Sequence, residues 1–156
     1  MPCTRCAKQV SVFLENKPGR LTDVCRALGD AGVNIRAFCV AEASEFGILR
    51  LIVDKPDVAA ETLAARGYAV TEHEVLAVQL QDRPGDLARA LTALSGAGIN
   101  VEYIYAFLTP KEQQAVVIFR VADAQVADTI ARLEEAAFEV IPAERIPRWG
   151  DIITVG

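Results

Sequence analysis

Apolar positions along the chain switch between a two-residue period and a helical period. A first strand is predicted where alternate positions are apolar, at Val10, Val12 and Leu14. A helix is predicted to follow, because apolar residues then recur three and four positions apart, at Leu21, Val24, Cys25 and Leu28. Gly32 follows this stripe, at a place where glycine commonly ends a helix. The pattern therefore predicts a strand and then one amphipathic helix.

The next stretch predicts a hairpin, a second helix and a last strand. Residues 35–41 and 48–53 are rich in apolar residues and are expected to form two paired strands. A second helix is expected after Asp54-Lys-Pro-Asp57, where Asp can cap the helix and Pro suits its first turn. Residues 68–71 complete the series as a strand that runs almost directly into the next part of the chain.

The same series occurs again 66 residues later. Glu15-Asn-Lys-Pro-Gly-Arg-Leu21 aligns with Gln81-Asp-Arg-Pro-Gly-Asp-Leu87, and Ala31-Gly-Val-Asn-Ile35 aligns with Ala97-Gly-Ile-Asn-Val101. From residue 12 to residue 40, ten of 29 positions are identical to their counterparts, against roughly two expected by chance. Four extra residues around 108–113 are expected to lengthen a hairpin loop of the second copy. The chain is therefore an internal duplication.

Each copy predicts a βαββαβ unit, so the expected fold is α+β with two ferredoxin-like repeats. Such a unit has an antiparallel sheet with both helices on one face. A unit of about 70 residues is marginally stable alone, so we expect the two repeats to pack side by side. The expected organisation is a tail over residues 1–8, a first domain over 9–74, a second over 75–142 and a tail over 143–156.

Composition and charge narrow the function classes. The 156 residues are 52% apolar and carry 16 Lys plus Arg against 21 Asp plus Glu, a net charge of −5. This composition is typical of a globular protein, and no apolar run reaches the length of a membrane span. The acidic pI of about 4.9 argues against nucleic acid or a membrane surface as a partner. Because the first eight residues show no secretory apolar segment, we expect a cytoplasmic protein.

The four cysteines are interpreted as thiols rather than as a disulfide framework. Cys25 and Cys39 lie within apolar patterns and are expected in the core. Cys3 and Cys6 form a C-x-x-C pair, but the sequence has no second pair and only one histidine, His73. We therefore interpret residues 1–8 as a mobile thiol-bearing tail. A metal or redox role assembled across a dimer stays open as the alternative.

Catalytic groups are sparse, and neither an enzyme activity nor a cofactor is predicted. His73 lies between Glu72 and Glu74 in an alternating stretch, which is more typical of a solvated strand than of a base placed beside a nucleophile. The Gly29-Asp-Ala-Gly32 and Gly96-Ala-Gly98 segments follow a helix and precede a strand. A dinucleotide loop needs the opposite order.

The two strand-to-helix turns carry the clearest binding signal. Lys17-Pro-Gly-Arg20 and Arg83-Pro-Gly-Asp86 each begin a helix with Pro, which lacks an N–H, and then Gly, which lets a ligand approach the backbone. The free N–H groups after Pro, with the positive end of the helix dipole, suit a small carboxylate. An ordinary helix start is the alternative for one such turn, but recurrence in both copies favours binding.

These residues resemble the ACT domain, a small amino-acid-sensing module of regulated metabolic enzymes. The resembling segments are Asn16-Lys-Pro-Gly-x-Leu21 with Gly32-Val-Asn-Ile35, and Asp82-Arg-Pro-Gly-x-Leu87 with Gly98-Ile-Asn-Val101. The resemblance covers about residues 9–141 and implies an effector, usually a free amino acid, bound between two paired units. The ligand-binding residues are then expected at Asn16, Lys17, Pro18, Gly19, Arg20, Leu21, Asn34 and Ile35, and at Asp82, Arg83, Pro84, Gly85, Asp86, Leu87, Asn100 and Val101.

Topology predicts that each site combines the two repeats. In a βαββαβ unit the first two strands point the same way, so the Pro-Gly turn and the asparagine lie at opposite ends of one unit. If the repeats pair about a pseudo-twofold axis, residues 16–21 meet Asn100 and residues 82–87 meet Asn34. The N–H groups of the turn would take the carboxylate, and the asparagine oxygen would accept from the ammonium.

The two sites are expected to differ from each other and from serine-sensing ACT domains. Asp82 carries a charge where the first repeat has Asn16, which favours an ammonium and disfavours a nearby carboxylate. Leu14 and Leu80 stand two residues before these positions, where the serine-sensing pattern has a polar imidazole. An apolar amino acid is therefore at least as plausible a ligand as serine.

The sequence favours a non-catalytic tandem ACT protein that senses an amino acid and forms a homodimer. The alternative is a regulatory subunit of a biosynthetic enzyme such as acetolactate synthase, whose small subunit begins with a segment similar to Ser11-Val-Phe-Leu-Glu-Asn16. A regulated enzyme partner is expected under both interpretations. Trp149, in the tail outside the repeat, is expected to fold back over the sheet.

Overall fold

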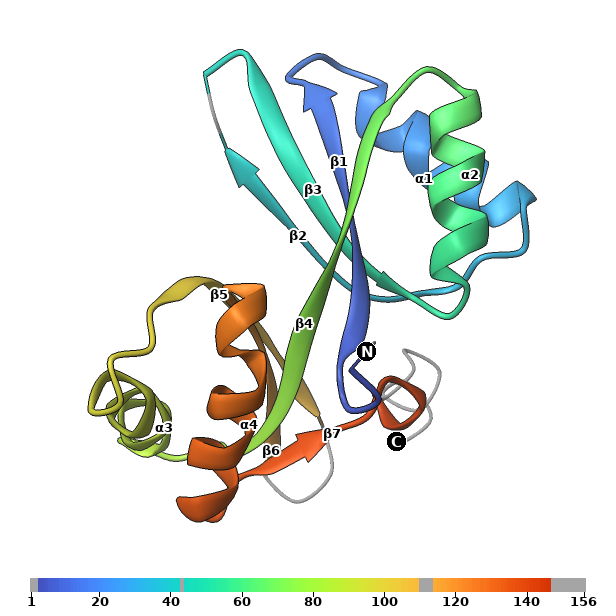
Figure 1. Ribbon diagram of the computed structural model, residues 1–156. Helices are drawn as coiled ribbons and strands as arrows, with labels where there is room; N and C mark the ends of the chain where they lie inside the picture. The colour runs from blue at the N-terminus through green and yellow to red at the C-terminus, as the bar shows by residue number, and fades with distance from the viewer. Residues whose placement is uncertain (1–2, 43, 110–113, 147–156) are drawn as a thin grey trace. The chain divides into compact units, whose positions relative to one another are not determined.

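The chain folds into two compact units, described by a computed structural model (Figure 1). The structure describes residues 3–42, 44–109 and 114–146. The first unit is Lys8–His73, and the second combines Glu74–Gly156 with Met1–Ala7. The chain therefore passes from one unit to the other after Ala7 and again after His73.

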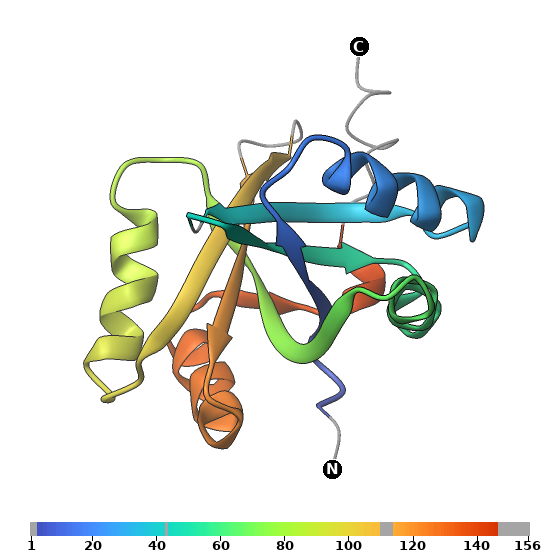
Figure 2. The same ribbon diagram turned by 90° about the horizontal axis from the view of Figure 1, so that it is seen from above.

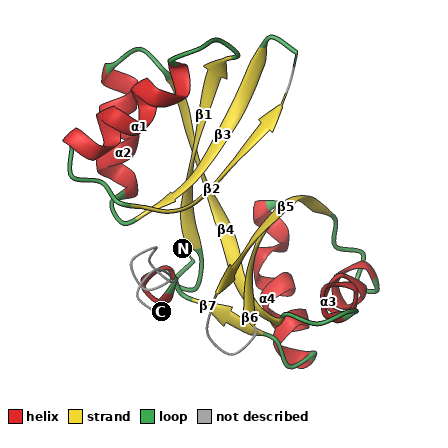
Figure 3. Cartoon of the chain, turned by 180° about the vertical axis from the view of Figure 1, so that it is seen from behind, coloured by secondary structure: helices red, strands yellow, loops and turns green. Residues whose placement is uncertain are grey.

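The first unit has the predicted βαββαβ order. Its elements are β1 (Ala7–Glu15), α1 (Arg20–Asp30), β2 (Ile35–Glu42), β3 (Phe46–Val53), α2 (Pro56–Ala65) and the start of β4 (Ala69–Gln81). Strand β3 lies between β1 and β2 and is antiparallel to both. Helices α1 and α2 lie together on one side of these strands (Figure 3).

The second unit repeats this order. After β4 come α3 (Asp86–Ser95), β5 (Val101–Thr109), β6 (Gln114–Val121), the 3-10 turn η1 (Asp123–Gln125), α4 (Val126–Glu135), β7 (Glu139–Ile141) and the 3-10 turn η2 (Ala143–Arg145). Strand β6 pairs with β4 and β5, and β7 pairs with the other side of β4. Helices α3 and α4 are neighbours (Figure 2). The predicted fold of two ferredoxin-like repeats is confirmed.

Each unit has its own core between its strands and its helices. In the first unit, helix α1 buries Val24, Ala27 and Leu28 against β1 and β3. In the second unit, Ala90 and Leu94 of α3 are buried at the matching positions. The predicted helical stripe is therefore right at its centre. It is wrong at Leu21 and Cys25, which are exposed. Cys39 of β2, also expected in the core, is half-buried.

The glycines predicted to end helices do so, but the aspartate predicted to cap α2 does not. Gly32 and Gly98 follow α1 and α3 with φ of 74° and 73°, a conformation that favours glycine. Pro56 takes the first turn of α2, but no side chain caps that helix. The Oδ1 atom of Asp54 instead accepts a hydrogen bond from the Asn34 N–H at 2.8 Å. The predicted aspartate caps are therefore wrong.

The N-terminal Cys-x-x-Cys turn is the main departure from expectation. Cys3 and Cys6 form a disulfide and are half-buried against the core of the second unit. The Cys3 N–H donates to Glu74 Oε1 at 3.3 Å, and Arg5 pairs with Glu134 of α4. The interpretation of residues 3–7 as a mobile thiol-bearing tail is therefore wrong, because packing and polar contacts hold this segment to the second unit.

Two sequence expectations fall outside the described residues. The four-residue insertion falls mainly on residues 110–113, between β5 and β6, and Trp149 belongs to residues 147–156. Among the helices of the described segments, none has the length and apolar character needed to cross a bilayer.

The glycine after α1 gives a direct test of these helix ends. Gly32→Ala forces a side chain into the left-handed region and should lower the free energy of unfolding by about 1–2 kcal/mol. Gly29→Ala is the matched control, because Gly29 lies inside α1 with open space around its Cβ position. The control should be neutral or raise stability by up to about 1 kcal/mol. Urea unfolding of both variants measures the difference, and equal stabilities would contradict the assigned helix end.

Candidate functional site

The first Pro-Gly turn leaves the start of helix α1 open. Gly19 is the N-cap residue, in the left-handed region at φ 89°, and no side chain accepts a hydrogen bond from the helix start. The first helical hydrogen bond runs from the Asp23 N–H to the Gly19 carbonyl at 2.9 Å. The N–H groups of Leu21 and Thr22 come before this first bond, so no carbonyl of the helix accepts a hydrogen bond from them. The turn therefore offers backbone donors at the positive end of a helix.

The backbone before the helix is held firmly. The Asn16 N–H donates to the Glu45 carbonyl at 2.9 Å, and the Lys17 N–H donates to the Glu15 carbonyl at 2.8 Å. The first bond fixes the turn to the hairpin between β2 and β3, and the second closes the turn itself. The donors at the start of α1 are thus preorganised, and little ordering would be needed for a ligand to bind them.

A cavity of about 350 Å³ lies at this turn within the first unit. Its apolar wall is formed by Leu14, Leu21 and Val40, and its polar side by residues 15–17 and Arg20. Leu21 is 44% exposed although it belongs to the apolar stripe of α1. Cavities of a few hundred Å³ with an apolar wall and a few polar groups are typical of small-molecule sites. Four of the predicted site residues therefore line a space of ligand size, namely Asn16, Lys17, Arg20 and Leu21.

The charges at this turn leave a net positive environment. Lys17 Nζ lies 2.9 Å from Glu15 Oε2, and Arg20 Nη2 lies 3.8 Å from Glu15 Oε1. The hydrogen bond from Lys17, and then the charges of Lys17 and Arg20, hold the pKa of Glu15 below its usual value. Glu15 is therefore ionised at neutral pH and balances one of the two cations. Asp23, in the first turn of α1, is paired with Arg66 at 2.9 Å, so the other cation remains to attract an anion.

The second turn copies the backbone of the first. Gly85 has φ 89° and ψ −13°, against φ 89° and ψ −14° for Gly19. The Arg83 N–H donates to the Gln81 carbonyl at 2.9 Å, as Lys17 does to Glu15. Helix α3 also begins without a side-chain cap on its N-cap residue. The sequence duplication is thus a duplication of turn geometry.

The charge distribution of the second turn is different, because Asp86 stands where the first repeat has Arg20. Asp86 is only 3% exposed, and its Oδ2 atom accepts a hydrogen bond from the Gln81 N–H at 2.8 Å. Its Oδ1 atom accepts from Arg89 Nη2 at 3.2 Å and lies 3.5 Å from Arg83 Nη2. The second turn therefore already holds a carboxylate of its own.

Surrounding groups keep Asp86 ionised despite its burial. Burial alone would raise the pKa of Asp86, but the Gln81 N–H and the Arg89 guanidinium outweigh it and the pKa is lowered. Arg89 is itself fixed, because its Nη1 donates to the Ala136 carbonyl at 2.7 Å and its guanidinium stacks 4.0 Å from the Phe138 ring centre. A cavity of about 220 Å³ lies beside this cluster.

The asparagines lie far from the turn of their own unit, as the topology predicts. Asn34 is exposed before β2, and its carbonyl accepts from the Asp54 N–H at 3.1 Å, after the end of β3. The turn is bonded to Glu45, before the start of β3. Since β3 has eight residues, these ends are roughly 26 Å apart. Asn100 likewise precedes Val101, which pairs with Val121 at the end of β6.

Sequence reasoning missed three features of the site. Val40 and Gly47 line the first cavity, but they come from β2 and β3 and belong to no turn motif. Strand register places them, since Gly47 pairs with Leu14. The third feature is the buried carboxylate of Asp86. Its signal was visible in the alignment of the repeats, where Arg20 and Asp86 have opposite charges at matching positions.

Comparison with known proteins agrees with this duplicated architecture. Residues 5–141 match the family model described as an ACT domain pair. No curated protein sequence matches the chain significantly. Among solved structures, protein BT0572 from Bacteroides thetaiotaomicron is 36% identical, with a TM-score of 0.81, and the match covers 97% of this chain and 98% of that one.

More distant structures share the fold. The ligand-free regulatory subunit of aspartate kinase from Thermus thermophilus is 15% identical, with a TM-score of 0.63, over 83% of this chain and 92% of that one. The regulatory subunit from Thermus flavus is 16% identical, with a TM-score of 0.61, over 85% and 93%. At these identities the likeness concerns the fold alone.

Asp86→Asn tests the internal carboxylate through its pH dependence. A carboxylate with a lowered pKa stabilises the fold above its unfolded pKa of about 3.9, and this contribution is lost as the pH falls below that value. The variant should therefore lower the free energy of unfolding by about 1–3 kcal/mol at pH 7, and its difference from the wild type should shrink below about pH 4.

Asp82→Asn is the control, because it removes an exposed carboxylate from the same turn. It should change stability by less than about 0.5 kcal/mol. Chemical denaturation across the pH range measures both variants. A difference between wild type and Asp86→Asn that does not change with pH would contradict the role given to this carboxylate.

Proposed function

The chain belongs to the ACT domain family as an ACT domain pair, and on that basis we propose that it is a non-catalytic regulatory protein that binds a free amino acid. The observation that carries the proposal is the open start of α1 beside a cavity of about 350 Å³. Free backbone donors beside a cavity support binding, rather than a reaction, as the role of these turn residues.

The ligand carboxylate would bind at the first turn. Residues 16–21 surround the uncapped N-terminus of α1, and Arg20 lies on the rim of the same cavity. A helix N-terminus and a nearby guanidinium both favour an anion. Because Glu15 balances only one of the two cations, a bound carboxylate would meet a favourable field.

The ligand ammonium would be bound by an asparagine of the other repeat. Asn34 lies at the far end of its own unit and cannot reach residues 16–21. We therefore propose composite sites that form when ACT units pair. Val101 would lie beside Asn100 in one site, and Ile35 would lie beside Asn34 in the other. Asn100 would serve the first turn, and Asn34 would serve residues 82–87.

An apolar side chain suits the first site best. Leu14, Leu21 and Val40 form the wall of the cavity, and none of them can hydrogen-bond a polar side chain. A ligand of about ten heavy atoms that gains roughly 0.5–0.8 kcal/mol per atom would bind with millimolar to micromolar affinity. That range suits a protein that responds to metabolite concentration.

The second site would bind the same ligand more weakly. Asp86 already neutralises part of the positive charge at the start of α3, and Asp82 adds another negative charge on the turn. Arg83 and Arg89 balance these two charges, so no net positive charge remains for a ligand carboxylate. The pair of repeats would therefore respond mainly through residues 16–21.

The regulated partner would be an enzyme of amino-acid metabolism in the cytoplasm. The regulatory subunits of aspartate kinase share this fold, which supports association with an enzyme. A homodimer stays part of the proposal. The alternative is a regulatory subunit of an enzyme such as acetolactate synthase, favoured by the segment Ser11–Asn16. Co-purification with a thiamine-dependent large subunit would decide for that alternative.

A thermal-shift screen of the twenty amino acids, followed by calorimetry, tests the first site. At least one apolar amino acid should raise the melting temperature, because a ligand that binds only the folded chain stabilises it. Arg20→Asp gives the first turn the residue of the second and should weaken this binding at least tenfold, or about 1.4 kcal/mol. The matched control is Arg26→Asp, which makes the same charge change further along α1 and should leave affinity unchanged. Absence of any stabilising amino acid would refute the proposed function.

A pair of asparagine variants tests the composite arrangement separately. Asn100→Ala should weaken the tighter site at least tenfold, because the ligand ammonium loses its acceptor. Asn34→Ala should leave that site unchanged and affect only the weaker one. Calorimetric titration of both variants distinguishes these outcomes. If Asn34→Ala and Asn100→Ala had the same effect on the tighter site, the assignment of Asn100 to the first turn would be wrong.

A further inference from the structure

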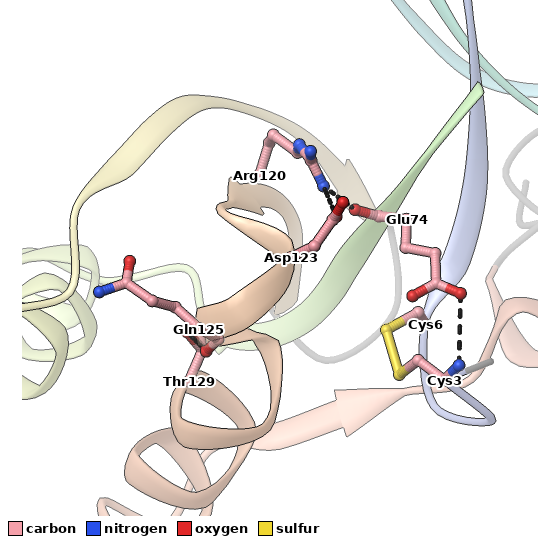
Figure 4. Close-up of a disulfide and its surroundings, with 7 residues drawn as sticks. All are labelled: Cys3, Cys6, Glu74, Arg120, Asp123, Gln125 and Thr129. Carbon is pink, nitrogen blue, oxygen red and sulfur yellow. Dashed lines mark hydrogen bonds and ion pairs between the residues drawn. A yellow bond between two sulfur atoms is a disulfide. The ribbon is translucent and has the colours of Figure 1, made fainter. Parts of the chain in front are cut away.

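The N-terminal Cys-x-x-Cys turn brings three metal-ligand side chains together. The Sγ atoms of Cys3 and Cys6 and a carboxylate oxygen of Glu74 all lie within 4.8 Å of one another. Figure 4 shows the Glu74 side chain extending from β4 toward the sulfur pair. All three residues are half-buried and belong to the second unit. This cluster has no part in the proposed effector site.

The position of Glu74 is fixed by contacts on both sides. Its carboxylate accepts a hydrogen bond from the Cys3 N–H at 3.3 Å, and its backbone carbonyl accepts from Arg120 Nη1 at 3.0 Å. Arg120 also pairs with Asp123 at 2.9 Å (Figure 4). Contacts within the folded second unit therefore hold the Glu74 carboxylate against the Cys-x-x-Cys turn.

The disulfide is not what holds the turn in place. Its two cysteines are three residues apart, so the bond closes only a small local loop and links no distant segments. Attachment to the second unit comes from the Glu74 contact, from the pair between Arg5 and Glu134, and from packing of both cysteines on the core. The three side chains should therefore stay close together when the disulfide is reduced.

The donor set suits a soft divalent cation. Two thiolates three residues apart and a carboxylate are zinc donors, and three protein ligands leave a fourth tetrahedral position for water. Sulfur atoms bound to one zinc ion lie about 3.8 Å apart, which fits a turn whose Cα atoms are 5.4 Å apart. A cavity of about 360 Å³ lies between this turn and the start of α4, lined by Cys3, Glu74, Val126 and Ala127.

We propose that Cys3, Cys6 and Glu74 of the reduced chain form a binding site for one soft divalent cation such as Zn²⁺, and that the disulfide is the closed, metal-free form of this site. A dithiol reductant supplies two electrons and two protons, is itself oxidised to a disulfide, and leaves two protein thiols. Cation binding then displaces those two thiol protons as two sulfur–metal bonds form. A disulfide oxidant such as oxidised glutathione would take two electrons from the two thiolates, take up two protons to become two thiols, and release the cation as the Cys3–Cys6 disulfide forms again.

Cobalt absorption spectroscopy tests the site on the full chain. The protein is reduced with tris(2-carboxyethyl)phosphine, which takes up the oxygen of one water as the disulfide becomes two thiols, and is then titrated with Co²⁺. We expect sulfur-to-cobalt charge-transfer and tetrahedral visible bands that saturate at one Co²⁺ per chain, and displacement of Co²⁺ by Zn²⁺. The oxidised chain should show neither band.

Matched variants assign the ligands. Cys3→Ser combined with Cys6→Ser should abolish the charge-transfer band, whereas Cys25→Ser combined with Cys39→Ser should leave it unchanged, because those two cysteines belong to the first unit. Glu74→Gln keeps an acceptor for the Cys3 N–H and removes the charge. It should weaken Zn²⁺ binding at least tenfold. Glu72→Gln removes a carboxylate two residues earlier in β4 and should leave affinity within twofold.

The result that overturns the proposal is a reduced chain that binds Co²⁺ or Zn²⁺ no more tightly than the oxidised chain. Saturation at one ion per two chains would also overturn it, because the cation would then be held by two cysteine pairs without Glu74. Circular dichroism of each variant shows whether it is folded. Glu74→Gln retains both cysteines, so it provides a test even if the cysteine variants fail to fold.

Discussion

The proposed effector site depends on one feature of the backbone, the uncapped N-terminus of α1. A helix start normally has its free N–H groups satisfied by a side-chain cap or by water. Here Pro18 supplies no N–H, Gly19 adopts the left-handed region, and no side chain accepts from the turn. The donors are therefore held in place with room for a ligand. The apolar wall of Leu14, Leu21 and Val40 gives this polar end an adjacent surface for a side chain.

The duplication shows how one backbone can carry two electrostatic environments. Gly19 and Gly85 have the same backbone angles, so the two turns present the same donors. Exchange of Arg20 for Asp86 changes the field around those donors without changing the turn. In the second repeat the carboxylate is internal, buried and held by Gln81 and Arg89. Backbone geometry and electrostatic environment are thus separable properties of this fold.

The fold could be predicted from the sequence because it rests on periodicity and repetition. The alternation at Val10, Val12 and Leu14, the stripe of α1 and the glycines after α1 and α3 were sufficient to place the elements. The predicted aspartate cap of α2 is absent, because Asp54 instead accepts a hydrogen bond from Asn34, 20 residues earlier in the chain. The propensities of neighbouring residues cannot predict a hydrogen bond between residues this far apart in the chain.

The site was only partly predictable for the same reason. The turn residues are contiguous in sequence, so a motif identifies them. Val40 and Gly47 reach the cavity through strand register, and the Cys3–Cys6 turn is placed by Glu74, 71 residues away. Spacing alone suggested that two cysteines were too few for a metal site. A carboxylate on a distant strand changes that conclusion, and only the folded chain brings it near.

The most direct test of the central claim is amide nuclear magnetic resonance during titration with the amino acid that stabilises the chain. The N–H signals of residues 19–22 should shift together and saturate with the calorimetric affinity, and those of residues 85–88 should shift only at higher ligand concentration. Saturable binding that leaves the signals of residues 19–22 unmoved would show that the ligand lies elsewhere, and the role given to the start of α1 would be wrong.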